Sequence, residues 1–192
     1  LGNIFSVVRI RASEIRSRRA RPDEWVTHPI SQLKGNFAQF LQAVEKNSHG
    51  RYRIVQNVAE QGKSDYLIHF ETSSETGDSL RMPMIFRDVM RDILANARKY
   101  TPPGGHISGG LFYEPRQLRY VVEDNGIGIP PNEIEDVIRF GHRAKNVLDH
   151  PTRGGGFGLT KAYYVTRRFR GRMWIDSNGE GTRVEIQLPV PK

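Results

Sequence analysis

Apolar residues recur every three or four positions in two segments at the start of the chain. In residues 3–20 they form a stripe opposite charged side chains, and residues 27–49 repeat the pattern after a break at residues 21–24. This spacing is typical of amphipathic helices, and Gly50 suits a helix C-terminal cap. The pattern therefore predicts a helical hairpin over residues 1–49. Because two helices cover each other poorly, we expect two hairpins to pair as a four-helix bundle. The alternative is packing on the chain's own second half.

After Gly50 the apolar period shortens to two, which is typical of strands. Helical spacing returns in three further segments, and a long polar loop spans residues 141–157. The expected strands are 51–56, 66–72, 106–113, 118–124, 172–177 and 182–188, and the expected helices are 83–100, one beginning at Pro131, and 158–170. This order predicts an α+β fold over residues 50–192, a two-layer α/β sandwich whose mixed, mostly antiparallel sheet carries helices on one face.

Length and composition limit the number of domains and the kinds of site that the protein can have. The 192 residues suffice for one domain with a helical appendage, and they include no cysteine, which excludes disulfides and thiolate metal sites. No run of about 18 apolar residues occurs. A chain that begins at Leu1 is expected to be part of a longer protein. We expect a cytoplasmic setting, with any membrane contact made through segments outside this sequence.

The formal net charge of +8 permits a polyanionic partner. Much of the excess lies in two arginine clusters, at residues 16–21 and 167–172. No aromatic residues interleave with the first cluster, so we expect a solvated helix end there and no nucleic-acid partner.

A polar face is expected on the helix over residues 83–100. Asp92, Asn96 and Lys99 are spaced i, i+4 and i+7, so they lie on one side of a helix. The Asn96 oxygen can bind Mg²⁺ and Lys99 can neutralise phosphate, while Asp92 can orient or deprotonate water or hold the metal through one. The alternative is a solvated face without function.

Asp124 ends the apolar strand 118–124, and Gly126 and Gly128 follow it. A carboxylate there can accept a hydrogen bond from an exocyclic amine such as adenine N6, whereas the guanine carbonyl would repel it. The two glycines let a flat base approach the backbone. A simple turn stabilised by the Asp124 side chain would also explain the pattern.

The glycine-rich run 153–159 leads directly into the expected helix 158–170. Exposed amide groups ahead of a helix N-terminus form an anion site, although the spacing is neither that of a Walker A loop nor that of a dinucleotide fingerprint. A flexible linker is the alternative. Residues 178–182 indicate an ordinary hairpin turn, unless Thr182 faces the site.

In order and spacing, these segments resemble the ATP-binding catalytic domain of sensor histidine kinases. That domain has the Bergerat fold, shared in the GHKL superfamily with type II topoisomerases, Hsp90 chaperones and MutL proteins. Residues 92–102 match its N box, and residues 124–129, 154–159 and 179–182 match its three glycine boxes. The resemblance covers about residues 80 to 190.

For the helix, the resemblance implies that Asn96 coordinates Mg²⁺, Lys99 meets the phosphates and Tyr100 lines the nucleotide cleft. Asp92 departs from the usual kinase pattern of Asn, His or Glu. In hydrolysing relatives a glutamate here activates water, and aspartate is one methylene shorter. We expect Asp92 to support the Mg²⁺ shell or to act as a general base.

The resemblance also implies roles for the glycine boxes. Asp124 bonds adenine N6, with Gly126 and Gly128 beside the base and Thr182 nearby. Phe140 corresponds to a degenerate phenylalanine box. The mobile lid around the triphosphate comprises Gly154, Gly156, Gly158 and Leu159.

The phosphoacceptor is not evident in the sequence. His28 and Pro29 do not match the common acceptor box. Residues 1–4 resemble the tail of the His-Arg-x-x-Asn box of a divergent HWE/HisKA_2-like kinase group, which places the acceptor histidine just before Leu1.

The resemblance implies a histidine kinase that binds ATP with Mg²⁺ and transfers the γ-phosphoryl group to a histidine. A response regulator then takes the group, and the kinase is a homodimer through its N-terminal helices. One alternative is an ATPase or nucleotide-gated switch in which Asp92 acts on water. The other is a non-enzymatic dimeric scaffold.

Overall fold

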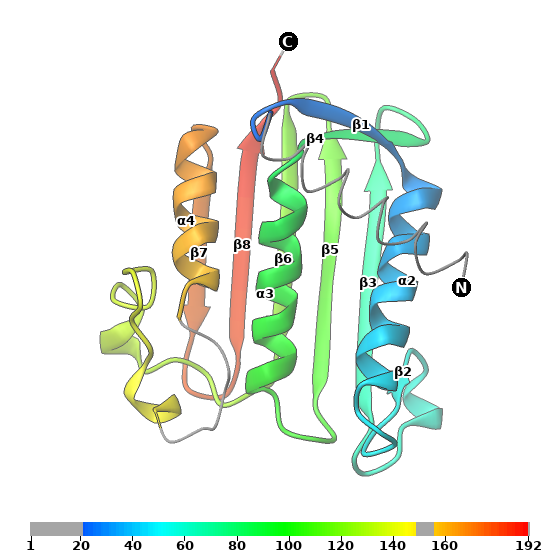
Figure 1. Ribbon diagram of the computed structural model, residues 1–192, viewed down its shortest axis with the longest axis vertical. Helices are drawn as coiled ribbons and strands as arrows, with labels where there is room; N and C mark the ends of the chain where they lie inside the picture. Colours follow the sequence, from blue (N-terminus) through cyan, green and yellow to red (C-terminus); the bar gives the residue numbers. More distant parts are fainter. Residues whose placement is uncertain (1–20, 149–155, 192) are drawn as a thin grey trace, which may run out of the picture.

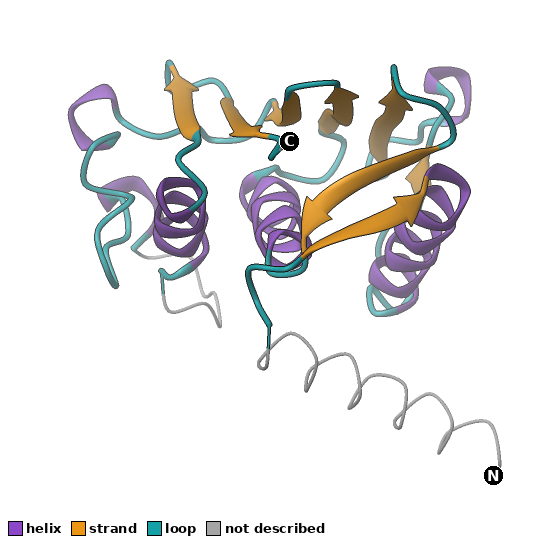
Figure 2. Cartoon of the chain, turned by 90° about the horizontal axis from the view of Figure 1, so that it is seen from above, coloured by secondary structure: helices purple, strands orange, loops and turns teal. Residues whose placement is uncertain are grey.

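Three helices lie side by side on one face of a six-stranded sheet (Figure 1). The computed structural model describes residues 21–148 and 156–191, so the expected helix over residues 3–20 lies outside the described residues. The three helices are α2 (Ile30–Lys46), α3 (Phe86–Tyr100) and α4 (Gly158–Arg168). Viewed from above, all three lie on the same side of the sheet (Figure 2).

The six-stranded sheet has the order β2-β3-β5-β6-β8-β7. Its strands are β2 (Ile54–Val55), β3 (Tyr66–Ser74), β5 (His106–Glu114), β6 (Gln117–Asp124), β7 (Arg172–Ser177) and β8 (Thr182–Pro189). The β2–β3 and β3–β5 pairs are parallel, and the remaining three pairs are antiparallel. The predicted mixed, mostly antiparallel sheet with helices on one face is confirmed.

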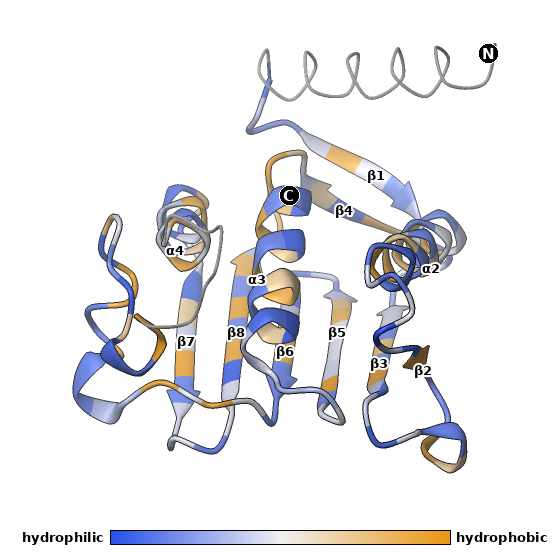
Figure 3. Cartoon of the chain, turned by 60° about the horizontal axis from the view of Figure 1, so that its bottom comes forward, coloured by the Kyte–Doolittle hydropathy of each residue, from blue (hydrophilic) through white to orange (hydrophobic). Residues whose placement is uncertain are grey.

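The core lies between the helices and the sheet. Strand β8 alternates apolar and polar residues, and its apolar Val184, Ile186 and Leu188 are buried (Figure 3). Helix α3 covers β6, where the Phe86 ring meets Tyr120 edge to face with centroids 6.0 Å apart. On the far face charged side chains meet water, and Arg183 Nη1 lies 3.1 Å from Glu123 Oε2. One buried and one wet face explain the period of two.

Helix α2 packs on the sheet of its own chain. The Phe37 ring stacks on Phe70 of β3 at a centroid distance of 4.4 Å, and Leu41 is buried in the same core. The apolar stripe of α2 is thus covered by the sheet of its own chain, as the alternative expectation had it. The division of the chain at residue 50 and the pairing of two copies stay predictions.

Two short strands lie where the sequence predicts the starts of two helices. β1 (Trp25–Pro29) pairs antiparallel with β4 (Ser79–Pro83) in a ribbon separate from the main sheet. We had expected residues 27–29 to be the first helical turn and residue 83 to begin a helix. Pro29 instead has the extended backbone of an N-cap, and Pro83 ends β4.

The prediction of a helix that begins at Pro131 is wrong. Residues 131–133 form one 3₁₀ turn, and further turns and a bend follow up to residue 141. The buried Glu133 carboxylate accepts the Lys145 backbone amide at 2.9 Å, which fastens this segment to a later loop. Of the apolar residues that suggested a helix, Val137 instead belongs to a small second core with Ile129, Ala144 and Val147, and Ile134 packs against that core.

His28 makes stability depend on pH. Its side chain is 9% exposed and its Nε2 has no hydrogen-bond partner within residues 21–148 and 156–191. Burial and the nearby Arg87 lower the pKa of His28. The unfolded chain therefore takes up this proton more readily, and we expect stability to fall as the pH drops through about 6.5.

Urea unfolding at pH 5.5 and 7.5 measures this effect. His28→Leu should flatten the dependence of the unfolding free energy on pH, whereas His69→Leu, at an exposed position of β3, should keep it. An unchanged acid slope in His28→Leu would contradict the prediction.

Candidate functional site

A cavity of about 560 Å³ lies beside α3, the ends of β6 and β8, and the start of α4. It gathers residues from the N box and from the three glycine boxes. The predicted residues that line it are Asp92, Asn96, Lys99, Tyr100, Asp124, Gly128, Gly156, Gly158, Leu159 and Thr182. Gly126 is not among its lining residues, and Gly154 lies outside the described residues.

The polar face of α3 turns toward the cavity as predicted. Asn96 lies against the start of α4, since a Cβ on Gly158 would come within 2.9 Å of Asn96 Nδ2. One turn earlier, Asp92 forms an ion pair with Lys161 of α4. At the end of α3, Lys99 Nζ lies 4.8 Å from the centroid of the Tyr100 ring. A carboxylate, an amide and an ammonium therefore share one wall.

Asp124 forms a turn and also borders the cavity. Its Oδ1 accepts the Gly126 amide at 2.9 Å, which is the expected turn, and its side chain also borders the cavity. Burial raises the pKa of Asp124 to about 6, although the amides of Gly126 and Thr182 hydrogen-bond to the carboxylate and oppose this rise. Thr182 lies directly opposite Asp124 in the β6–β8 register and lines the cavity too.

The glycines after Asp124 are required by close backbone contacts. A Cβ on Gly126 would meet the Tyr100 carbonyl oxygen at 2.5 Å, and one on Gly128 would meet Gly179 at 2.7 Å. Gly128 also has a φ of 65°. These glycines let the strand end pass between α3 and the β7–β8 hairpin, a reason that a single sequence could not supply.

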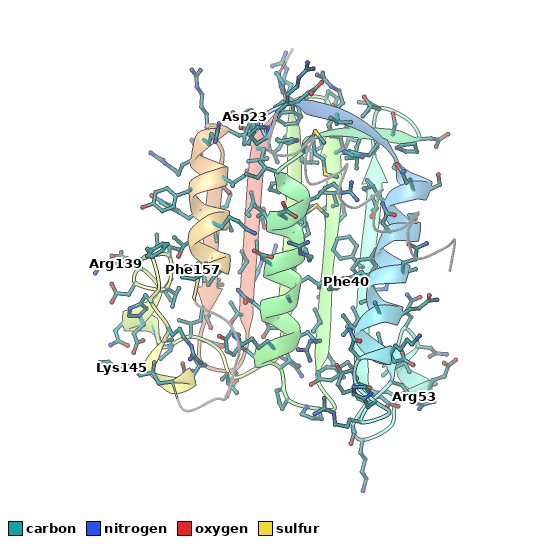
Figure 4. The ribbon with its side chains drawn as sticks, in the orientation of Figure 1. Asp23, Phe40, Arg53, Arg139, Lys145 and Phe157 are labelled. Carbon is teal, nitrogen blue, oxygen red and sulfur yellow. The ribbon has the colours of Figure 1, made fainter. Side chains whose placement is uncertain are left out.

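Helix α4 begins at Gly158, and its first turn borders the cavity. The amides of a helix's first turn lack partners within the helix and favour anions. The ring of Phe157, just before it, lies against that of Phe140 with centroids 4.7 Å apart and the planes tilted by 40°; Phe140 is largely exposed and Phe157 about half exposed. Phe157 lies at the foot of α4, near the segment that carries Arg139 (Figure 4).

The sequence analysis missed three cationic or titratable residues at this site. His142 and Arg143 line the cavity from the segment expected only as a loop, and Lys161 reaches Asp92 from α4. Arg143 Nη2 donates to the Val147 carbonyl at 2.5 Å. No periodic pattern marks a loop residue, and only the packing of α4 on α3 reveals the partner of Lys161.

The oxygen donors suit a metal that is shared with phosphate. Within the parts of the chain that the structure describes, no group of three or more His, Cys, Asp or Glu side chains could hold an ion. Asp92 and Asn96 offer oxygens from one helix face. Mg²⁺ is commonly held by one or two such side chains together with substrate phosphates and water, so this donor set fits it.

A strand-end carboxylate, a polar helix face and a helix N-terminus around one cavity are the parts of a nucleotide-binding domain. Residues 82–192 match the family described as histidine kinase-, DNA gyrase B-, and HSP90-like ATPase. The chain belongs to this family, and ATP binding is implied by it. The expected catalytic domain is confirmed, whereas the divergent dimerisation hairpin stays a prediction.

The curated relatives are bacterial sensor kinases. The sensor histidine kinase WalK of Bacillus subtilis (strain 168) is 36% identical over 104 residues, which are 53% of this chain and 17% of WalK. The adaptive-response sensory kinase SasA of Thermosynechococcus vestitus is 30% identical over 147 residues, or 71% of this chain and 38% of that protein. The chain therefore spans less than half the length of these relatives.

Solved structures of sensor kinases share the fold. The mycobacterial sensor histidine kinase MprB superposes with a TM-score of 0.60 at 20% identity, covering 85% of this chain and 97% of that one. The nucleotide-free catalytic domain of the histidine kinase ThkA gives 0.62 at 16% identity, covering 86% and 97%. At these identities the likeness concerns the fold alone. Within residues 21–148 and 156–191, no helix is long and apolar enough to cross a membrane.

Proposed function

We propose that this chain binds Mg·ATP in the cavity and transfers the γ-phosphoryl group to a histidine, as the catalytic part of a two-component sensor kinase. The observation that supports this most directly is the pairing of Asp124 and Thr182 at one cavity with the polar face of α3. A base-selective acceptor and a set of metal and phosphate contacts thus share one space.

The chemistry asked of the protein is positioning and charge neutralisation. Asp124 would accept the adenine amine, with Thr182 beside it, and Asn96 would offer its oxygen to Mg²⁺. Mg²⁺ would supply charge stabilisation on the phosphates. Lys99 and the first amides of α4 would contact the phosphates, joined by the glycine-rich run that ends at Gly158.

We place the acceptor histidine upstream of Leu1. His28 cannot serve readily, because its side chain is buried in β1. Homodimerisation through the N-terminal helices stays part of the proposal, although the apolar stripe of α2 already packs on the sheet of its own chain. A response regulator would then receive the phosphoryl group on an aspartate, and we expect these steps in the cytoplasm.

Incubation with γ-labelled ATP, with ADP release measured in parallel, tests the reaction. We expect residues 1–192 to release little ADP, and a longer chain with the upstream segment to gain an acid-labile phosphohistidine. The longer chain with its upstream histidine changed to alanine is the control. Steady ADP release by residues 1–192 would favour the ATPase or nucleotide-gated switch, and the absence of any turnover in both chains would favour the scaffold.

A further inference from the structure

Lys161 gives Asp92 a cationic partner from the neighbouring helix. The Lys161 ammonium pairs with Oδ2 of Asp92, and Arg91 Nε lies 3.7 Å from the other oxygen. Arg91 itself lies nearer to Asp88, at 3.2 Å. The Asp92 side chain is 26% exposed and borders the cavity. Its charge is thus matched chiefly by an ammonium on α4.

The packing of the two helices fixes this pair. Asp92 comes one turn before Asn96 on α3, and Lys161 comes one turn after Gly158 on α4. Because Gly158 lies against the Asn96 amide, the side chains of Asp92 and Lys161 also meet. A pair held by close helix packing loses less side-chain entropy than two mobile surface residues.

A carboxylate on the wall of a polyphosphate site opposes the ligand, because like charges repel most strongly where water is scarce. Without a partner, Asp92 would need a divalent cation between itself and the phosphates. With Lys161 in place that charge is already balanced, and Lys99 at the same cavity can attract phosphate. A metal that binds Asp92 must moreover compete with Lys161.

We propose that Lys161 neutralises Asp92 and thereby lowers the divalent-metal requirement of nucleotide binding at this site. The inference rests on the proposed binding of ATP in the cavity. It makes Lys161 a positioning and charge-balancing residue, and it leaves Asp92 as an optional metal ligand, not the base that the sequence suggested.

Calorimetric titration of ATP with excess Mg²⁺ and with EDTA tests this proposal. The measured quantity is the ratio of the two dissociation constants. Lys161→Met should raise the ratio of the EDTA value to the Mg²⁺ value roughly tenfold, chiefly by weakening metal-free binding. The double variant Lys161→Met with Asp92→Asn should bring metal-free affinity back to within about threefold of the wild type, since the unbalanced charge is gone.

Lys161→Arg, which keeps the charge, should behave as the wild type. Lys34→Met, at an exposed position of α2, is the matched control, and thermal unfolding without ligand confirms that each variant is folded. An equal loss of affinity with and without metal in Lys161→Met, or no recovery in the double variant, would overturn the inference while leaving ATP binding intact. A wild-type chain that binds no ATP under either condition would overturn the proposed function itself.

Discussion

Asp124→Asn is expected to lower ATP affinity by roughly 10- to 100-fold and to erase the preference for ATP over GTP. A hydrogen bond to a charged group contributes about 1.5–3 kcal/mol, and the asparagine amide would turn a donor toward the donor N6 of adenine. Calorimetry with ATP and with GTP in Mg²⁺ measures both quantities. Glu123→Gln is the matched control, because Glu123 precedes Asp124 on β6 and pairs with Arg183 on the far face.

The pH dependence of the same carboxylate gives a second measure. Since the pKa of Asp124 is raised to about 6, wild-type ATP affinity should be constant above pH 7 and fall below pH 6, as a proton takes the acceptor. Asp124→Asn should not show this fall. An ATP affinity that is unchanged in the variant, or equally acid-sensitive in it, would remove Asp124 from base recognition.

The free energy of unfolding should change with pH in the direction opposite to ATP affinity. A carboxyl whose pKa is raised on folding holds its proton more tightly in the folded state, so ionisation costs stability as the pH rises from about 4 to 6. The cost above pH 6 is at most about 3 kcal/mol. Asp124→Asn should therefore unfold at pH 7.5 no more easily than the wild type, which separates lost binding from lost folding.

Gly128→Ala is expected to be the most destabilising single change near the site, by about 3 kcal/mol or more. A left-handed φ costs a residue with a Cβ about 1–2 kcal/mol, and the added Cβ would also lie within 2.7–2.9 Å of the Gly179 backbone. The hairpin would have to move, and Thr182 lies on it. Nucleotide binding should be lost as well.

Gly179→Ala separates these two causes. Gly179 also has a positive φ, of 88°, but an added Cβ would meet nothing within 4 Å. Urea unfolding should therefore show a loss of only about 1–2 kcal/mol, from backbone conformation alone. Equal losses in both alanine variants would show that the close approach at Gly128 has no energetic consequence.

The local periodicity of apolar residues was sufficient to predict the long helices and strands. Helices α2, α3 and α4 and strands β3 and β5 to β8 were predicted within a few residues because each has one buried and one wet face. The five-residue β1 and β4 were missed, since each is too short to show a period. The segment after Pro131 has helical spacing but buries its apolar residues in the second core through turns.

The residues of the site could likewise be predicted from the sequence only where they lie on regular elements. Residues on regular elements, such as Asn96 and Asp124, could be placed from the sequence because the element decides which way they face. Their partners could not: Lys161 depends on how α4 meets α3, and His142 and Arg143 depend on an irregular loop. The role of Gly128 likewise exists only once the hairpin at Gly179 is in position.

The β6–β8 ladder has a consequence for how the protein acquires its activity. Strand β6 pairs with β5, which precedes it in the sequence and is joined to it by a tight turn. Its other neighbour, β8, is separated from it in the sequence by the loops, α4 and β7. Contacts between distant segments form late, because the chain entropy of closing the loop must be overcome first. Asp124 and Thr182 face each other across that last seam. The end of the cavity where we propose that the base binds therefore forms only when folding is complete, and nucleotide would then stabilise only fully folded molecules.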